Sequence, residues 1–123
     1  MSIKDTIKDV VLLPNLFNKL GNRSIYDLLK DTGYFNLFNQ INEGDIKKIL
    51  KKNTSCVNDW LLYSENKRTD GGYFFQKDEN DKYVVSFFDS KKQKFENRKI
   101  YTDKMQACSL FIKMEIEEIR KID

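Results

Sequence analysis

The hydrophobic pattern of this chain changes its period at the glycine pair Gly71-Gly72. Before the pair, apolar residues recur every three or four positions, which is the spacing of one face of an α-helix. After it come runs of aromatic and β-branched residues that are typical of strands. From Asp103 onward the helical spacing returns. This order favours the α+β class: helices first, an antiparallel sheet next and a closing helix that packs on the sheet.

Capping residues predict where the N-terminal helices begin and end. Ser2 is followed by an acidic residue three positions later, as at a helix N-cap, and Pro14 disallows a regular continuation of that first helix. Ser24 has the same signature for a second helix, which should stop at Gly33. Another helix is expected after a cap at Asp45.

Two further segments of the N-terminal half have helical character. The dense apolar residues of 34–41 predict a brief helical turn. A longer helix is expected over residues 54–68, capped by Thr54 or Ser55 and with Trp60 facing inward.

The C-terminal half predicts a three-stranded antiparallel β-meander followed by one helix. Residues 73–75 and 83–88 form two aromatic strands around the polar tip 78–82. Residues 95–101 form a weaker third strand, which we expect at the edge of the sheet because it is rich in charge. Asp103 is expected to cap the last helix.

Length and composition exclude several classes of protein. The 123 residues fit a single globular domain over 1–123. The chain has no histidine, so it lacks the commonest general base and metal ligand. Cys56 and Cys108 stand 52 positions apart without a CxxC motif, which predicts reduced core residues of a cytoplasmic protein. No segment approaches the roughly 18 apolar residues of a membrane span.

No motif predicts catalysis, a cofactor or a metal. The acidic residues of 78–81 lack the ligand spacing of a calcium loop and fit a solvated turn. Glu115, Glu117 and Glu118 stand among basic residues at salt-bridge spacing, so we expect a solvated helix face. Gly71-Gly72 has no helix N-terminus after it and predicts a turn. The chain is therefore not expected to be an enzyme.

Basic stretches at 47–52 and 91–99 leave a nucleic-acid-binding or regulatory module as the alternative. Phe74, Phe87 and Phe88 would then stack bases. The favoured interpretation places these aromatic side chains in the core and the lysines in solvent. The net charge of +3 is also too small for the broad basic surface of a dedicated DNA-binding domain.

The segment 60–75 resembles a known family. A helix carrying W-x-x-Y-S-x-x-K-R, followed by a glycine turn and an aromatic strand, is similar to small bacterial immunity proteins of contact-dependent growth inhibition and related polymorphic-toxin systems. The similarity extends over residues 24–120 and includes four outlying patterns: Y-x-L-L-K-x-T-G-Y-F at 26–35, D-I-K-K-I-L-K-K at 45–52, Y-V-V-S-F-F at 83–88, and A-C-x-x-F-I-K-x-E-I at 107–116.

The resemblance implies a cytoplasmic protein that binds one cognate toxin domain and neutralises it. The toxin domain is expected to be the C-terminal nuclease of a large exported protein. The positions that match the family pattern are Trp60, Tyr63, Ser64, Lys67, Arg68, Gly72 and Tyr73. We interpret them as architecture: Trp60 in the core, Arg68 paired with a carboxylate or with helix-end carbonyls, and Gly72 enabling the turn into the first strand.

The docking surface is predicted from charge. A nuclease cleft is basic, so an inhibitor gains by presenting carboxylates in place of phosphates. The acidic positions that we expect to contact the toxin are Glu65, Asp70, Asp78, Glu79 and Asp81. The lysine-rich stretch 91–99 is the next candidate.

Overall fold

The computed structural model describes residues 2–67 and 71–122, so Arg68 and Asp70 lie outside the described residues. The described chain forms seven α-helices, one short 3₁₀ helix and one antiparallel sheet, which confirms the α+β class. In chain order the elements are α1 (Ile3–Val11), α2 (Leu13–Leu20), α3 (Ile25–Asp31), α4 (Tyr34–Leu37), the 3₁₀ helix η1 (Phe38–Gln40), α5 (Glu43–Leu50), α6 (Cys56–Glu65), β1 (Gly72–Lys77), β2 (Tyr83–Asp89), β3 (Lys94–Tyr101) and α7 (Lys104–Arg120).

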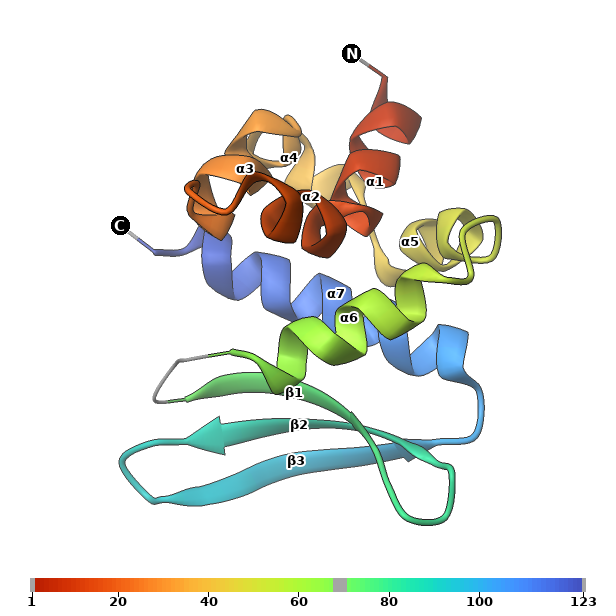
Figure 1. Ribbon diagram of the computed structural model, residues 1–123, viewed down its shortest axis with the longest axis vertical. Helices are drawn as coiled ribbons and strands as arrows, with labels where there is room; N and C mark the ends of the chain where they lie inside the picture. The colour runs from red at the N-terminus through yellow and green to blue at the C-terminus, as the bar shows by residue number, and fades with distance from the viewer. Residues whose placement is uncertain (1, 68–70, 123) are drawn as a thin grey trace.

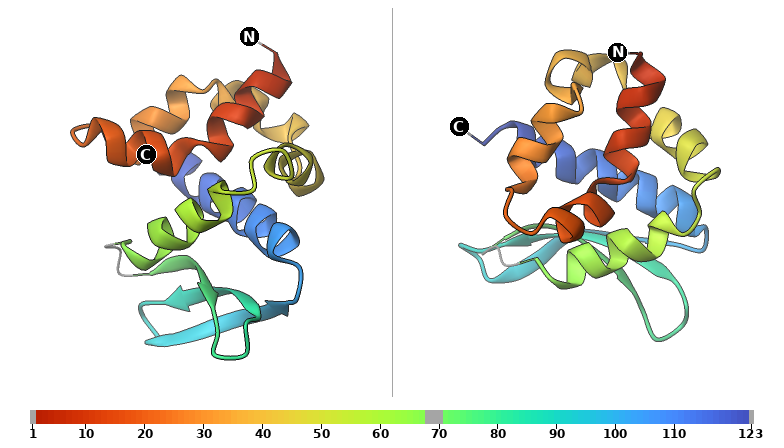
Figure 2. Two further views of the ribbon diagram at one scale, coloured as in Figure 1. Left: turned by 45° about the vertical axis from the view of Figure 1, so that its right-hand side comes forward. Right: turned by 45° about the horizontal axis from the view of Figure 1, so that its top comes forward.

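The elements are arranged with α7 at the centre. Figure 1 shows α1 to α5 on one side of α7 and the sheet on the other, with α6 beside it, and both views of Figure 2 keep this order. The closing helix packs on the sheet as predicted, and it also packs on α3 and α5. Phe111 and Ile112, which are adjacent in sequence, are therefore both fully buried.

Three predicted helix starts are confirmed by capping hydrogen bonds. The Ser2 hydroxyl accepts from the backbone N–H of Asp5 at 3.1 Å, and the Ser24 hydroxyl accepts from that of Asp27 at 3.1 Å. Asp103 accepts from the first backbone N–H groups of α7. Such caps satisfy donors that the helix itself leaves unpaired.

The interruption predicted at Pro14 is the start of another helix. The first helix ends at Val11, and α2 begins at Leu13 with Pro14 in its first turn. Proline is tolerated there because the N–H groups of the first turn have no partner within the helix. A proline after an apolar helix therefore marks a break between two helices here.

Two predicted boundaries are wrong: the N-cap of α5 and the C-terminal end of α6. The N-cap of α5 is Asn42, whose side chain accepts from the N–H of Asp45 at 2.9 Å, while the Asp45 carboxylate accepts from the N–H of Asn42 at 3.0 Å. Asp45 is thus the third helical residue of a capping box. The helix predicted over 54–68 runs only from Cys56 to Glu65, so its C-terminal end is wrong. Ser55 is its N-cap, as predicted, although its side chain makes no capping bond.

The sheet is the predicted meander, in the order β1-β2-β3 with both pairs antiparallel. Alternate residues of a strand point to opposite faces. Phe75 points toward α7, where its ring stacks on Phe111 with centroids 5.6 Å apart. Phe74 and Phe88 lie on the opposite face, so the prediction that they belong to the core is wrong.

Cys56 and Cys108 are buried free thiols, as predicted. Within the described part of the chain, every helix is too short or too polar to cross a lipid bilayer.

Candidate functional site

Two family-pattern residues, Tyr63 of α6 and Lys67 just beyond its end, meet one buried acidic residue of α7. Lys67 Nζ lies 2.8 Å from Glu115 Oε1, and the Tyr63 hydroxyl donates to Glu115 Oε2 at 2.6 Å. Lys67 also donates to the backbone carbonyl of Tyr73 at 2.7 Å. We call Tyr63, Lys67, Glu115 and the Tyr73 carbonyl the Lys67–Glu115 centre. It joins α6, β1 and α7.

The Lys67–Glu115 centre is shielded from water. The side chains of Lys67 and Glu115 are 6% and 4% exposed, and both oxygens of Glu115 have a hydrogen-bond donor. Burial, together with the neighbouring Glu115 carboxylate, raises the pKa of Tyr63, so this hydroxyl stays a donor. The expectation that Glu115 lies on a solvated face is wrong.

The free edge of β1 is covered by α6. The backbone N–H of Phe75 donates to the Ser64 hydroxyl at 2.7 Å. On the same edge, Lys67 Nζ donates to the backbone carbonyl of Tyr73. Ser64 and Lys67 thus hydrogen-bond to backbone groups of β1 that would otherwise pair with a neighbouring strand. An uncovered edge is a site for unwanted strand pairing, so this contact closes one side of the sheet.

Trp60 and the two glycines Gly71 and Gly72 also have structural roles. Trp60 is fully buried, and its indole N–H donates to the carbonyl of Val11 at 3.0 Å. Gly72 has a φ of +112°, which side chains rarely tolerate, and a Cβ on Gly71 would stand 2.8 Å from the Phe88 carbonyl oxygen. Both glycines are thus required by the turn into β1. Arg68 lies outside the described residues.

A second polar cluster ties α4 and η1 to α7. The buried Tyr34 hydroxyl donates to Glu117 at 2.6 Å and accepts from Lys113 at 2.7 Å. Arg120 donates to the same Glu117 carboxylate and lies over the ring of Phe38 at 3.7 Å. Burial acts to raise the pKa of Glu117, but the hydrogen bonds from Arg120 and Tyr34 and the charge of Lys113 outweigh it, so this pKa lies below its usual value.

A cavity of about 530 Å³ adjoins the Lys67–Glu115 centre. Its wall includes apolar side chains from three helices: Phe17 of α2, Ile25 of α3 and Ile119 of α7. Lys67 and Glu115 border it from the side of the sheet.

The predicted acidic docking positions do not form one surface. Glu65 ends α6 beside the start of β1, whereas Asp78, Glu79 and Asp81 lie at the other end of that strand, which at six residues spans about 20 Å. Asp70 lies outside the described residues.

Two of the carboxylates at the hairpin tip have partners within the tip. Asp78 accepts from the N–H groups of Asn80 and Lys82 and so holds the turn, and Asp81 pairs with Lys77 at 3.4 Å. Glu79 is exposed and, among the described residues, has no such partner.

The face of the sheet turned away from α7, which we call the outer face, carries an aromatic cluster. The Phe95 ring packs edge-on against Phe88, with centroids 4.9 Å apart, and against Phe74 at 6.1 Å. Phe95 and Ile100 remain 52% and 56% exposed. The antiparallel register, with Phe88 opposite Phe95, is what brings these residues of three strands together.

The two lysine stretches lie on different sides of the molecule. Lys47 to Lys52 belong to α5 and its C-terminal end, where Lys47 pairs with Asp103 at 3.4 Å. Residues 91–99 begin in the β2–β3 loop, which Figures 1 and 2 place at the opposite end of the molecule from α5, and continue along β3. The sheet and α5 lie on different sides of α7, so the two stretches do not share one face of the molecule.

Sequence reasoning missed both Glu115 and the outer face. A signal for Glu115 was present, because Phe111, Glu115 and Ile119 follow each other at intervals of four and place the glutamate within the apolar stripe of α7. Its partner Lys67 is 48 residues away, and no local pattern joins the two.

Comparison with protein-family models, curated proteins and solved structures found no match. Among residues 2–67 and 71–122, no three histidine, cysteine, aspartate or glutamate side chains gather closely enough to hold a metal ion.

Proposed function

We propose that this chain is an immunity protein that binds one cognate toxin domain in the cytoplasm and neutralises it by covering its surface, without catalysis of its own. The proposal starts from the resemblance of segment 60–75 to such proteins. The toxin domain is proposed to be the C-terminal nuclease of a large exported protein, whose substrate the bound immunity protein keeps away.

One observation carries the proposal: the family-pattern positions in the described chain each have a structural role at the junction of α6, β1 and α7. Trp60 anchors α6 to α1, Ser64 and Lys67 cover β1, and Tyr63 holds Glu115. A pattern whose members cooperate in one junction is a signature of a fold, and this supports the resemblance as a relationship of architecture.

Inhibition by binding needs a complementary surface of about 800 Å² on each partner and a few buried anchors. The outer face offers exposed aromatic and aliphatic side chains on a sheet whose other face packs against α7. The acidic positions stay a second prediction for contact with a basic cleft: Glu65, Asp70, Asp78, Glu79 and Asp81.

Co-purification tests the proposal. The probe is the C-terminal domain of the protein encoded directly upstream of this chain, produced with an inactivated active site and an affinity tag. We expect the two chains to co-elute as one complex in size-exclusion chromatography. The upstream protein without its C-terminal domain is the control. Separate elution of both chains at micromolar concentration would contradict the proposal.

A further inference from the structure

We propose that the outer face and the adjoining basic segment 89–99 are the docking surface of this protein, and that the partner surface seated there is an acidic protein surface with an apolar centre. The inference rests on the proposed function and adds to it the place of docking and the chemistry of the partner.

The aromatic cluster supplies the anchor. Phe74 and Phe88 are partly covered and support Phe95 from two sides, at interplanar angles of 77° and 64°. Phe95 is therefore held in place while half of it remains open to solvent. A preorganised aromatic side chain at the centre of a patch is the usual form of an interface hot spot, because little side-chain entropy is lost on binding.

The charge next to the cluster selects the partner. The segment 89–99 contains five basic and two acidic residues, so its charge of +3 equals that of the whole chain. Asp89 accepts from backbone N–H groups of its own loop, and Glu96 pairs with Lys92 at 3.1 Å. Lys91, Lys94 and Arg98 have no ion pair among the described residues. Such a rim is complementary to carboxylates.

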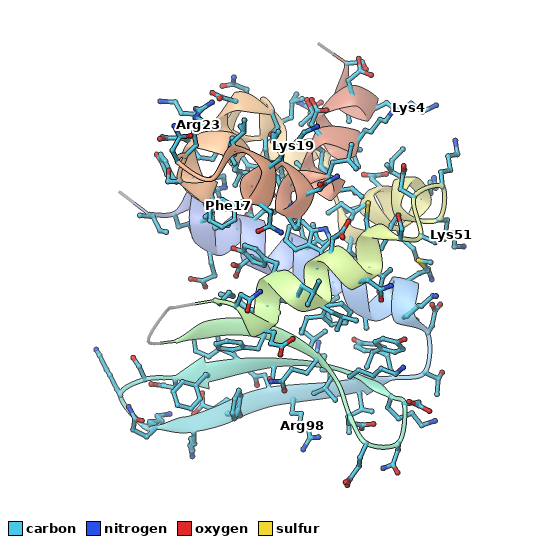
Figure 3. All side chains as sticks on the ribbon, in the orientation of Figure 1. Lys4, Phe17, Lys19, Arg23, Lys51 and Arg98 are labelled. Atoms are coloured by element: carbon cyan, nitrogen blue, oxygen red, sulfur yellow. The ribbon has the colours of Figure 1, made fainter. Side chains whose placement is uncertain are left out.

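The Arg98 side chain points away from the helices, as Figure 3 shows. Its guanidinium is therefore available to a partner that approaches the sheet from outside. Arginine pairs with carboxylates through two parallel hydrogen bonds, which adds geometric specificity to the charge.

The geometry favours a folded protein surface over single-stranded nucleic acid. A base-stacking platform needs ring faces open to the bases. Here the Phe95 ring meets its two neighbours edge to face, so the three rings do not form a flat platform. The second lysine stretch belongs to α5, across α7 from the sheet, so it does not extend the basic rim of the outer face.

The edge of β3 disfavours binding by addition of a strand. Val85 pairs with Lys99 and Phe87 with Glu96, so two residues of β3 stand opposite Ser86 in a bulge. Asn97, within the bulge, has a φ of 53°. Bulges and charges interrupt the regular backbone pattern that an added strand would need. The partner is thus expected to pack on the face.

If the partner is a nuclease, docking here places the protein on an acidic surface beside the basic cleft. The hairpin tip 78–82 lies at the far end of the same sheet (Figure 1), where it projects beyond the docked face. Neutralisation would then act by steric exclusion of the nucleic acid.

The test compares binding of the inactivated upstream toxin domain by matched variants. F95S and K91E/K94E alter the outer face and its rim. L62S removes a leucine that is also 52% exposed but lies on α6, and K51E/K52E reverses two exposed lysines at the end of α5. Urea unfolding verifies that every variant is folded.

We expect F95S and K91E/K94E each to lose at least tenfold in affinity, the charge effect fading as salt is raised, while L62S and K51E/K52E stay within twofold. Equal affinity of all variants for the toxin domain would overturn the docking surface and leave the function standing. Failure of the unaltered protein to bind would overturn the function itself. Binding of a single-stranded oligonucleotide in place of the toxin domain, or a dimer that F95S dissociates, would also overturn the inference.

Discussion

Lys67 Nζ lies 2.8 Å from Glu115 Oε1, and this buried pair holds the segment that follows α6 to α7 beside the first strand. Taking two charges out of water is costly, and such a pair is retained when each charge satisfies the other. The pair therefore makes the position of β1 depend on both helices.

Removing one member of the Lys67–Glu115 pair should destabilise the protein. We expect K67M to lose about 3–5 kcal/mol of unfolding free energy, because Glu115 is left as an uncompensated buried charge. Urea denaturation measures it. K92M, which breaks the solvent-exposed pair with Glu96, is the control and should lose less than about 1 kcal/mol. Similar losses in both variants would contradict the buried role of Lys67.

A second prediction concerns the edge of β1 that Ser64 covers. S64A leaves the backbone N–H of Phe75 without its acceptor and should cost about 1–3 kcal/mol. S55A removes the serine at the other end of the same helix, which makes no capping bond, and should be nearly neutral. Chemical denaturation measures the unfolding free energy of both variants. Equal stability would mean that the Ser64 hydroxyl does not accept a stabilising hydrogen bond from the N–H of Phe75.

The sequence predicted the elements whose signals are local. Ser2, Ser24 and Asp103 sit directly before apolar periodic segments, and all three cap helices. The start of α5 was misplaced because Asn42 and Asp45 both have capping chemistry, and only the reciprocal hydrogen bonds distinguish the cap from the third helical residue.

The candidate site depends on contacts between residues that are distant in sequence, so local sequence patterns did not predict most of it. Lys67 and Glu115 meet only when β1, β2 and β3 return the chain to α6. The cluster around Phe95 depends on strand register, which sequence patterns do not fix to the residue. What the sequence contained was the short spacing of Tyr63, Ser64 and Lys67, which places the first two side chains in the last turn of α6 and the third two residues beyond its end.

The cysteines should be unreactive in the folded protein. Burial raises the pKa of the Cys108 thiol, and burial with the nearby Asp59 raises that of Cys56, so little thiolate is present at neutral pH. We expect no fast reaction with a disulfide reagent such as DTNB in buffer, and reaction of both thiols in 8 M urea. Fast labelling of either cysteine under native conditions would show that it is not in the core.

Acid should weaken the contact between α4 and α7. The pKa of Glu117 is lower in the folded chain than in the unfolded chain, so the unfolded state takes up more protons as the pH falls. The stabilisation is present above the ordinary glutamate pKa of about 4.3 and is lost as the pH falls through the lower folded value.

Urea midpoints at neutral pH and near pH 3 measure this effect. E117Q should differ from the unaltered protein mainly at neutral pH, and E118Q, at an exposed position of the same helix, is the control. An E117Q difference that is equally large at both pH values would contradict a role for the ionised carboxylate.

Growth protection tests the proposed function most directly. The upstream toxin domain is expressed from an inducible promoter in cells with and without this chain, and with the K67M variant as a destabilised control. We expect cells carrying the unaltered chain to continue to grow after induction, while cells without it stop. Equal growth arrest in the presence and absence of the chain would contradict the proposed immunity function.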